Sequence, residues 1–547
     1  MAETILQLDP RDNVLVALTT LDLGTYVRFG SAASQQQCQV MQTIPAKHKM
    51  ATKALKPGEL ITMYGMIVGE VVEAIPAGGL ITTSNIRHRA ADYTAARHPV
   101  IHPLPDPTPW VGRTFMGYHR EDGQVGTRNY WIVLPLVFCE NRNVEQMREA
   151  LEEELGYGTV NSAYRRHVRE LISKQGNGHN VAEEMAAARG ERLFPNLDGV
   201  RFLPHQGGCG GTRQDSQALC GLLAGYIHHP NVAGATVLSL GCQHAQSSIL
   251  MEELRARDPK LRKQVIIVDQ QSSGTESNLM NIALDKTFAA LAEANRAERA
   301  PAPLSALTVA LQCGGSDGFS GISANPAVGY VSDLVVGAGG TTILSEFPEL
   351  HGVEQELVNR CTSDELAERF SGLMRTYAAA ARAVNSDFAF NPSPGNIRDG
   401  LITDAIKSAG AARKGGSSPI SGVLDYPEYV SARGFNLQCT PGNDVESVTA
   451  QVGAGSNLVL FTTGLGTPTG NPIAPVIKIS TNSTTGERMH DIIDFDAGPI
   501  VSGKSTIKDS AEELLELSIA VASGERQTKA ELHNQRDFIP WKRGVSL

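Results

Sequence analysis

Four cysteines stand where their thiols can bind a metal ion. Each follows an apolar run: Cys139 after residues 130–138, Cys209 after 202–204, Cys242 after 235–240 and Cys313 after 307–311. Converging thiolates are soft ligands that suit iron, iron–sulfur clusters or zinc. The alternative is that these cysteines are small apolar side chains packed at strand ends, since no Cys-x-x-Cys pair is present.

Glycine-rich loops adjoin two of these cysteines. Residues 207–211 read Gly-Gly-Cys-Gly-Gly, and residues 313–318 read Cys-Gly-Gly-Ser-Asp-Gly. Glycine lets the backbone approach a ligand and exposes its N–H groups, which suits recognition of carboxylates or hydroxyls. A tight turn without a ligand is the alternative for each loop, but several such loops at one sheet edge favour binding.

A basic segment, Lys47-His48-Lys49-Met50-Ala51, provides a candidate base. Two neighbouring positive charges disfavour the imidazolium form, so His48 tends to be neutral near pH 7. A neutral imidazole can accept a proton as a general base, and Lys49 is the second catalytic candidate. The alternative is a solvated basic turn.

Further polar residues are candidates for holding an anionic substrate. The guanidinium groups of Arg87 and Arg128 match a carboxylate in bidentate fashion. The other candidates lie in turn-rich sequence or beside these arginines: Asn129, Asn396, Lys414, Ser417, Asn443 and Asp444.

The elements that would position these residues fall into distinct regions. Residues 12–85 contain short β-like runs between turn signals, which predicts a small β module. Five prolines within residues 96–112 predict an extended linker. Beyond it, buried strands alternate with helices, which predicts an α/β body built on a parallel sheet. Because ligands bind at the carboxyl ends of such strands, we expect the four thiols at one sheet edge.

Composition excludes several classes of protein. The 547 residues carry a formal net charge of −10, so nucleic acid is not an expected partner. The N-terminus has no basic start ahead of an apolar core, and no apolar run approaches the roughly 20 residues of a membrane span. We therefore expect a cytoplasmic protein without membrane association or disulfides.

Several longer phrases resemble one known family, that of the altronate and galactarate dehydratases with sulfolactate sulfo-lyase. The resemblance is carried by K-H-K-M-A at 47–51, D-G-Q-V-G-T-R-N at 122–129, G-C at 208–209 and 241–242, C-G-G-S-D-G-F-S-G-I-S-A-N-P at 313–326, N-P-S-P-G-N at 391–396, P-G-N-D at 441–444 and I-D-F-D-A-G at 493–498. They extend over nearly the whole chain. The loop at 205–213 is richer in glycine than in the altronate dehydratases, which leaves the substrate within the family open.

The resemblance implies an architecture and an activity. It implies a β-clip (SAF) domain over 1–95, a linker over 96–112, a dimerising middle domain over 113–232 and a Rossmann-like catalytic domain over 233–547. It also implies that a homodimer or larger homo-oligomer dehydrates a sugar acid, D-altronate first among them, with ferrous iron or an iron–sulfur cluster. Mn²⁺ is the expected substitute.

The mechanistic hypothesis places iron beside Cys209, Cys242 and Cys313, with Cys139 as a further thiolate. A mononuclear site with oxygen or nitrogen ligands such as His205, His244 or Asp317 is the competing arrangement. His48 would remove the proton next to the carboxylate. One rival function is sulfite elimination from sulfolactate, and another is a non-catalytic sugar-acid sensor. A zinc hydrolase is the weakest rival, because the sequence lacks any ordinary spacing of zinc ligands.

Overall fold

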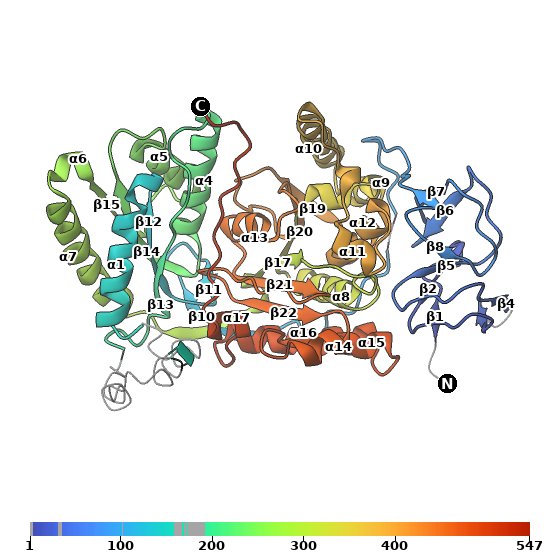
Figure 1. The fold of residues 1–547 in the computed structure, drawn as a ribbon. Helices are drawn as coiled ribbons and strands as arrows, with labels where there is room; N and C mark the ends of the chain where they lie inside the picture. Colours follow the sequence, from blue (N-terminus) through green and yellow to red (C-terminus); the bar gives the residue numbers. More distant parts are fainter. Residues whose placement is uncertain (1–3, 31–34, 101, 158–166, 169–170, 172–191) are drawn as a thin grey trace. The chain divides into compact units, whose positions relative to one another are not determined.

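A computed structural model describes residues 4–30, 35–100, 102–157, 167–168, 171 and 192–547. The chain forms two compact units (Figure 1). The first contains residues 1–119, 123–127 and 300–541. The second contains residues 120–122, 128–299 and 542–547.

The first unit begins with a β-rich domain of short strands, which confirms the predicted β module. Its strands are β1 (Ile5–Leu6), β2 (Val14–Ala17), β3 (Tyr26–Phe29), β4 (Gln36–Gln39), β5 (Lys49–Ala51), β6 (Leu60–Met63), β7 (Met66–Val71), β8 (Leu80–Ile81) and β9 (Ile86–Arg87). They form antiparallel sheets in the orders β1-β2-β5-β8, β3-β4 and β6-β7-β9. Strand β5 is central in the first of these, so Lys49 lies on a strand paired on both sides.

A linker follows the β-rich domain. The described part of residues 96–112 contains neither helix nor strand, as its prolines predict. It leads to strands β10 (Thr114–His119) and β11 (Val125–Gly126), which form a small sheet with β16 (Arg299–Pro303).

The second half of the first unit is built on a parallel sheet of seven strands. In sheet order they are β19 (Ile420–Leu424), β20 (Gly434–Gln438), β18 (Thr341–Leu344), β17 (Thr308–Cys313), β21 (Leu458–Thr463), β22 (Val476–Ser480) and β23 (Phe495–Asp496). The chain leaves β17 toward β18 and later returns to β17's other side with β21. Loops diverge at such a switch point, which leaves a crevice at the carboxyl ends of the strands.

Helices pack around this sheet. They are α8 (Ala324–Gly337), α9 (Glu354–Arg360), α10 (Asp364–Ala383), α11 (Pro394–Arg398), α12 (Asp404–Ala412), α13 (Asp444–Gly453), α14 (Ser483–Arg488), α15 (Gly498–Val501), α16 (Ile507–Ala522) and α17 (Lys529–Leu532). Short 3-10 turns η2 (Leu304–Ala306), η3 (Phe347–Leu350), η4 (Phe388–Phe390) and η5 (Arg413–Gly415) lie between them.

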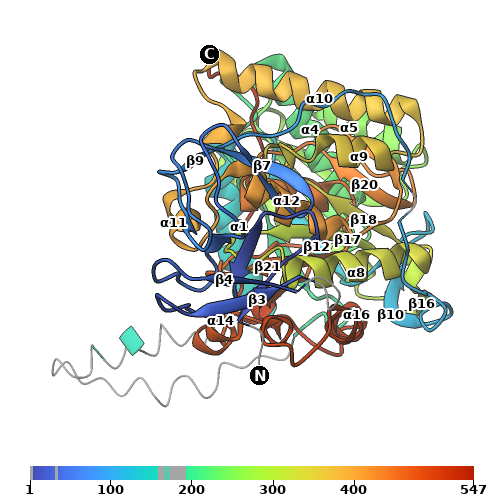
Figure 2. The ribbon, with the colours of Figure 1, turned by 90° about the vertical axis from the view of Figure 1, so that its right-hand side faces the viewer.

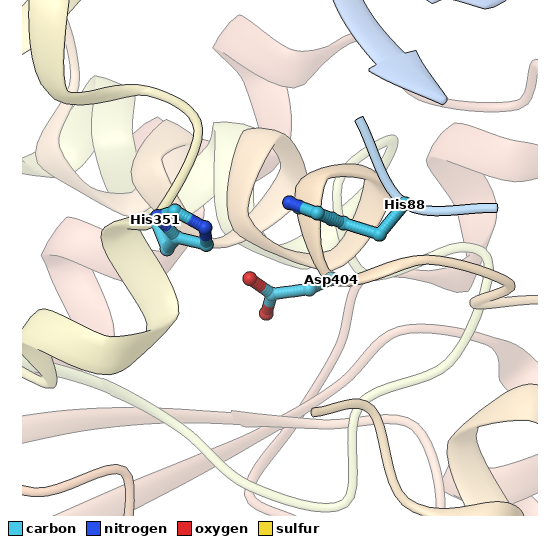
Figure 3. A group of neighbouring side chains, drawn as sticks. All are labelled: His88, His351 and Asp404. Atoms are coloured by element: carbon cyan, nitrogen blue, oxygen red, sulfur yellow. The ribbon is translucent and has the colours of Figure 1, made fainter. Parts of the chain in front are cut away.

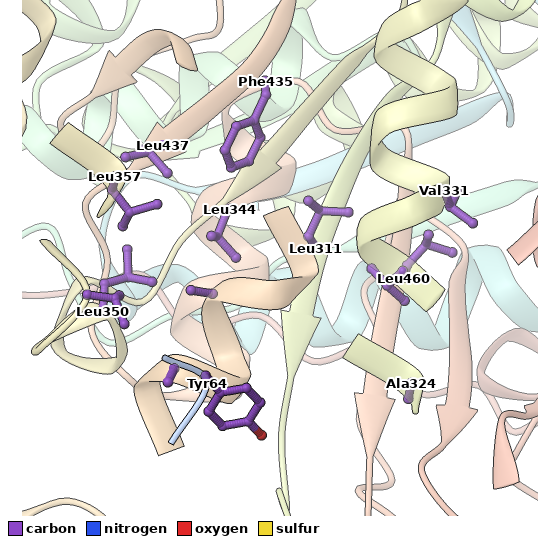
Figure 4. Packing of buried hydrophobic residues seen from close by; sticks show 14 of the residues in the cluster. Tyr64, Leu311, Ala324, Val331, Leu344, Leu350, Leu357, Phe435, Leu437 and Leu460 are labelled. Carbon is purple, nitrogen blue, oxygen red and sulfur yellow. The ribbon is translucent and has the colours of Figure 1, made fainter. Parts of the chain in front are cut away.

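One hydrophobic core joins the β-rich domain to the parallel sheet. Tyr64 and Val68 of the β-rich domain belong to the same cluster as Ile406 of α12 and Leu344 of β18 (Figure 4). In Figure 2, β7 and α12 lie side by side, and Thr403 Oγ1 donates a hydrogen bond of 2.7 Å to the carbonyl of Val68. Burying an apolar side chain of this kind contributes about 1.5–3 kcal/mol to the stability of the fold. The shared core therefore holds the β-rich domain, and with it the basic loop that precedes β5, against the sheet domain.

The second unit contains its own parallel sheet, in the order β13-β12-β14-β15. Its strands are β12 (Tyr130–Pro135), β13 (Gly199–Phe202), β14 (Val232–Ser239) and β15 (Gln264–Asp269). Its helical elements are η1 (Phe138–Glu140), α1 (Asn141–Glu154), α4 (Arg213–His228), α5 (Ser247–Arg257), α6 (Gln270–Ser273) and α7 (Glu276–Ala294).

This arrangement differs from the expected single sheet. Strands β12, β13 and β14 pair with one another, whereas β17 pairs with β18 and β21. Cys139, Cys209 and Cys242 therefore follow strands of one sheet, and Cys313 is the last residue of a strand of another. The expected boundary between residues 232 and 233 falls at the start of β14, whose pairing with β12 places residues 233–299 in the second unit.

None of the described helices combines the length and the apolar character that crossing a membrane requires.

Candidate functional site

The loop after β17 forms the centre of the candidate site. It lies at the carboxyl end of the sheet, beside the switch point between β17 and β21. Asp317 is fully buried there, and its carboxylate accepts hydrogen bonds from Thr481 Oγ1 at 2.9 Å and Asn482 Nδ2 at 3.1 Å. Both donors follow β22, so two strand ends hold this carboxylate in place.

The basic loop of the β-rich domain reaches this carboxylate. Lys47 Nζ lies 3.0 Å from Asp317 Oδ2 and 3.1 Å from Asp399 Oδ1. Burial opposes the charge on Lys47, but the two carboxylates raise its pKa above the ordinary value. Lys47 is thus a fixed ammonium group that ties the loop to the sheet domain.

His48 and Lys49 lie in different environments. His48 is half-buried, and its Nδ1 lies 3.2 Å from the carbonyl of Ala46. Burial and then the neighbouring Lys49 lower the pKa of His48, so the imidazole is neutral at pH 7. Lys49 is only 1 % exposed, and its Nζ donates to the carbonyls of Gly400 at 2.6 Å and Lys47 at 3.0 Å.

These contacts bear on the catalytic role expected of Lys49, which stays a prediction. Burial lowers the pKa of Lys49 to about 7, opposed by Asp317. The amine of Lys49 is fully buried and held by two carbonyls, an arrangement that also fits a residue that positions the loop. His48, with its half-buried ring, keeps the predicted role of general base.

Two glycines allow the basic loop to approach closely. A Cβ at Gly318 would lie 2.5 Å from the carbonyl oxygen of Lys47, and one at Gly400 would lie 2.4 Å from the same atom. Gly400 also has a φ of +90°, which disfavours any other residue. The loop can therefore reach Asp317 only because both neighbours lack side chains.

We expect Gly318→Ala to lower turnover by about 100-fold, because the added methyl displaces the loop that carries His48, and a shift of about 1 Å can cost this much. Steady-state kinetics on the folded variant would measure it. Gly372→Ala is the matched control, since a Cβ there would meet nothing within 4 Å. Unchanged turnover in Gly318→Ala would show that the position of the loop does not matter.

A second cluster of charged residues is buried beside this loop. Lys414 Nζ lies 2.7 Å from Cys313 Sγ and 3.5 Å from Glu346 Oε2. Lys407 Nζ lies 2.6 Å from Glu349 Oε1. A Cβ at Gly314 would lie 2.2 Å from Asp444 Oδ2, so that carboxylate packs directly on the glycine loop.

The charges of this cluster nearly balance. Burial raises the pKa of Glu346, and the neighbouring Glu349 raises it further. Burial also opposes ionisation of Glu349, but Lys407 and Lys414 outweigh it and lower its pKa. Burial raises the pKa of the Cys313 thiol to about 12, so the thiol is neutral at pH 7. The ammonium groups of Lys407 and Lys414 thus face the carboxyls of Glu346, Glu349 and Asp444. When one of these carboxyls stays protonated, the charges cancel.

Several other predicted residues also lie near the glycine loop. Asn396 Nδ2 donates to the carbonyl of Ser316 at 2.7 Å. The backbone N–H of Ser417 donates to Asp333, which holds the turn that carries Lys414. The predicted Cys313, Lys414 and Asp444, together with Asp317 of the competing arrangement, therefore meet at the end of β17.

Other predicted residues have structural contacts instead. Arg87 is largely exposed and pairs with Glu70 at 2.8 Å. Asn443 is exposed and caps α13. Arg128 and Asn129 belong to the second unit, where Asn129 Nδ2 donates to the carbonyls of Asn196 and Ala294. The contacts of Arg87, Asn443 and Asn129 explain their positions without a substrate, and substrate binding by Arg128 stays a prediction.

The predicted metal ligands of the second unit lie on adjacent loops. The loops of Cys209 and Cys242 meet where the backbone N–H of His244 donates a hydrogen bond of 2.9 Å to the carbonyl of Gly208. The side chains of Cys139, Cys209 and Cys242 are all exposed. His205 is buried, with Nε2 2.7 Å from the carbonyl of Pro135. Iron binding by these thiols stays a prediction.

Among the described residues, two groups of three have potential ligand atoms within 4.8 Å of one another: Cys313, Glu346 and Glu349, and His88, His351 and Asp404. Sequence reasoning missed five of these six. Glu346 could have been found, because it follows Leu344 of β18 by two residues. No short spacing links His88, His351 and Asp404 (Figure 3).

In the second of these groups Asp404 is buried, His88 and His351 are half-buried, and the polar atoms are only partly hydrogen-bonded. Burial lowers the pKa of His88 to about 4, so its imidazole is neutral. Burial and then Glu349 raise the pKa of Asp404 well above its ordinary value. Within the described part of the chain, neither carboxylate oxygen of Asp404 has a hydrogen-bond partner.

Family comparisons agree with this division of the chain. The altronate/galactarate dehydratase SAF domain matches residues 3–89, and the second domain of D-galactarate dehydratase/altronate hydrolase matches residues 117–295. The C-terminal domain of D-galactarate/altronate dehydratase matches residues 304–546.

Curated relatives match over almost the whole length. An altronate dehydratase of Escherichia coli is 32% identical over 98% of both chains. A galactarate dehydratase (L-threo-forming) of the same organism is 31% identical over 96% of this chain and 94% of its own. A (2R)-sulfolactate sulfo-lyase subunit beta of Chromohalobacter salexigens is 29% identical over 78% of this chain and 97% of its own. The chain therefore belongs to the altronate/galactarate dehydratase family and is a sugar-acid dehydratase, a hydro-lyase.

Proposed function

We propose that this dehydratase converts D-altronate to its 2-keto-3-deoxy acid and water, with ferrous iron as cofactor. One observation carries the chemistry: a neutral, half-buried His48 is held beside a glycine loop and an array of buried charges by the Lys47–Asp317 ion pair. The choice of altronate is supported by full-length similarity to altronate dehydratases of Escherichia coli and Bacillus subtilis.

The reaction needs a base and a means of expelling hydroxide. In the proposal, His48 accepts the proton from the carbon next to the substrate carboxylate, and the hydroxyl on the following carbon leaves as water. The enol that results tautomerises to the keto acid. When bound, iron supplies Lewis acidity, which stabilises negative charge on oxygen.

The remaining groups bind and orient the substrate. The exposed N–H groups and small volume of the glycine loop suit a carboxylate or a hydroxyl. Lys414 and Lys407 supply fixed positive charge beside that loop. Lys47 and Lys49 keep His48 in place, and burial keeps its imidazole in the neutral form that accepts a proton.

A panel assay tests this proposal. The purified full-length chain, supplied with Fe²⁺ and reductant without oxygen, is incubated with altronate, galactarate and other aldonates while 2-keto-3-deoxy acid is measured. We expect product from altronate that disappears after addition of a chelator. Product from galactarate alone would mean that galactarate, and not altronate, is the substrate. No product from any of the sugar acids would contradict the proposal.

A second candidate activity is favoured by the match to 97% of the sulfolactate sulfo-lyase subunit. The base would remove the same proton, but sulfite would leave instead of water. Release of sulfite from sulfolactate, with no keto acid formed from the sugar acids, would favour this alternative. Binding of a sugar acid without turnover would favour the sensor.

A further inference from the structure

His88, His351 and Asp404 come together from three separate elements. His88 follows β9 of the β-rich domain, His351 follows η3, and Asp404 is the first residue of α12. One potential ligand atom from each lies within 4.8 Å of the others. Figure 3 shows a ring nitrogen of His88 and the carboxylate of Asp404 directed toward the space beside His351.

Three polar atoms of this triad, one on His88 and two on Asp404, are buried without hydrogen-bond partners among the described residues. Asp404 is 1 % exposed, and neither its two carboxylate oxygens nor His88 Nδ1 has a hydrogen-bond partner among the described residues. A buried polar atom left without a partner costs about 1–3 kcal/mol, and more if charged. Thr403 Oγ1 already caps α12 through the N–H of Ile406, so Asp404 is not needed as a cap. Three unsatisfied polar atoms on two neighbouring residues indicate a ligand.

His351 is oriented as metal-binding histidines are. Its Nδ1 lies 2.9 Å from Glu354 Oε1, and Glu354 Oε2 accepts the N–H of Gly352 at 2.7 Å. A carboxylate on one ring nitrogen places the proton there and leaves Nε2 as a lone-pair donor. The His88 and His351 rings stack with centroids 5.2 Å apart, so both present ring edges to the same region.

The surrounding charge also favours a cation. Glu349, Glu354 and Asp387 all act on Asp404 as negative charges, and Lys407 is the opposing positive one. Lys407 is already paired with Glu349 at 2.6 Å. By contrast, the Cys313–Glu346–Glu349 group is contacted by two ammonium groups, which a metal ion would have to displace.

From this geometry we propose that His88, His351 and Asp404 bind a divalent transition-metal ion. Two histidines and one carboxylate are the ligand set of non-haem ferrous sites, which leave open positions for oxygen ligands. Two ligand atoms that each lie about 2.1 Å from one ion are at most about 4.2 Å apart, and the three potential ligand atoms lie within 4.8 Å of one another. The inference deepens the proposed function, since it locates the ferrous ion which that function requires.

Metal binding is measured without substrate, so it does not depend on turnover. The full-length chain is freed of metal by a chelator under anaerobic reducing conditions and titrated with Fe²⁺, or with Co²⁺ as a spectroscopic probe. Bound metal is counted after desalting. The variants are Asp404→Asn, His88→Gln and Glu354→Gln, with Cys209→Ser and Cys242→Ser for the thiol site. His490→Gln, an exposed histidine of the same unit, is the control.

We expect about one ion per chain, bound without the near-ultraviolet charge-transfer band that thiolate ligands give to Co²⁺. Asp404→Asn and His88→Gln should lose this ion, and Glu354→Gln should bind it about 10- to 100-fold more weakly. The two cysteine variants and His490→Gln should match the unmodified chain. If Asp404→Asn does not fold, the metal content of His88→Gln decides whether the triad binds the ion.

Wild-type metal content in both His88→Gln and Asp404→Asn would overturn the triad, as would loss of the ion in either cysteine variant. A chain that binds no ion at all would overturn it as well. An ion bound by the triad with no turnover of any sugar acid would leave the site intact and contradict the proposed function instead.

Discussion

Replacing His48 by alanine is expected to lower kcat by about 100- to 10,000-fold while leaving metal content and folding unchanged. This is the range that removal of a general base costs. Because the base acts only in the transition state, kcat and kcat/KM should fall together, with little change in KM. Lys47 and Lys49 keep their contacts with Asp317 and Gly400, so the loop remains in place.

Exchange of the C2 proton separates a base from a residue that only supports the loop. In D₂O the unmodified chain should incorporate deuterium at C2 of the substrate that is recovered before turnover is complete, and His48→Ala should lose this exchange along with turnover. His490→Gln is the matched control, because His490 is exposed and its ring contacts only the carbonyl of Glu487 among the contacts seen for it. Near-normal turnover or exchange in His48→Ala would show that another residue is the base.

The pH profile gives an independent test of the same assignment. The pKa of His48 is lowered by burial and by Lys49 and Lys47, while Asp399 opposes them. The base is active when neutral, so activity is lost as the pH falls through this pKa. We therefore expect the acid limb of kcat/KM below pH 6.5, the ordinary histidine value. An acid limb above that value would mean that His48 is not the group that titrates.

Much of the fold could be predicted because its signals are local. The turn signals in residues 12–85 predicted short antiparallel strands, and five prolines in 96–112 predicted the absence of helix and strand there. The number of sheets could not be predicted. Apolar runs alternating with helices have the same pattern whether β12 pairs with β17 or, as it does, with β13 and β14.

The candidate site could be predicted only where a reactive side chain lies at the end of a strand or in the loop directly after it. That pattern located Cys313 and Asp317 after β17, and it extends to Glu346 after β18. It could not find Lys407, which lies on α12, or His88, because the strand before it, β9, has only two residues and leaves no apolar run in the sequence. Their neighbours in space are distant in the chain, and only the tertiary packing of the β-rich domain on α12 brings them together.

Replacing Lys414 by methionine is the change with the largest expected effect on stability. Lys414 is 1 % exposed and is the ammonium group that contacts Cys313 and Glu346. Its loss leaves the carboxyls of Glu346, Glu349 and Asp444 facing Lys407 alone. Removing one partner of a buried ion pair costs about 3–5 kcal/mol, because the remaining charge has no compensation.

The midpoint of urea unfolding of the first unit, followed at several pH values, would measure this loss. Lys508→Met is the matched control, because Lys508 is 62% exposed and only 3.9 Å from Glu512. An exposed pair of this kind contributes about 0–1 kcal/mol, so its midpoint should hardly move. A midpoint of Lys414→Met equal to that of the control would show that the cluster does not need its second ammonium group.

The size of the loss should depend on pH in one direction. In the unmodified chain the pKa of Glu349 is lowered, although burial opposes this, because Lys407 and Lys414 stabilise its ionised form. That contribution is present above the unfolded-state pKa of glutamate and disappears as the pH falls. Without Lys414 the carboxyls can avoid the penalty by taking up protons. The difference between Lys414→Met and the unmodified chain should therefore be larger at pH 8 than at pH 5, and Lys414→Met with Glu346→Gln should recover part of it at pH 8, because one uncompensated carboxyl is gone.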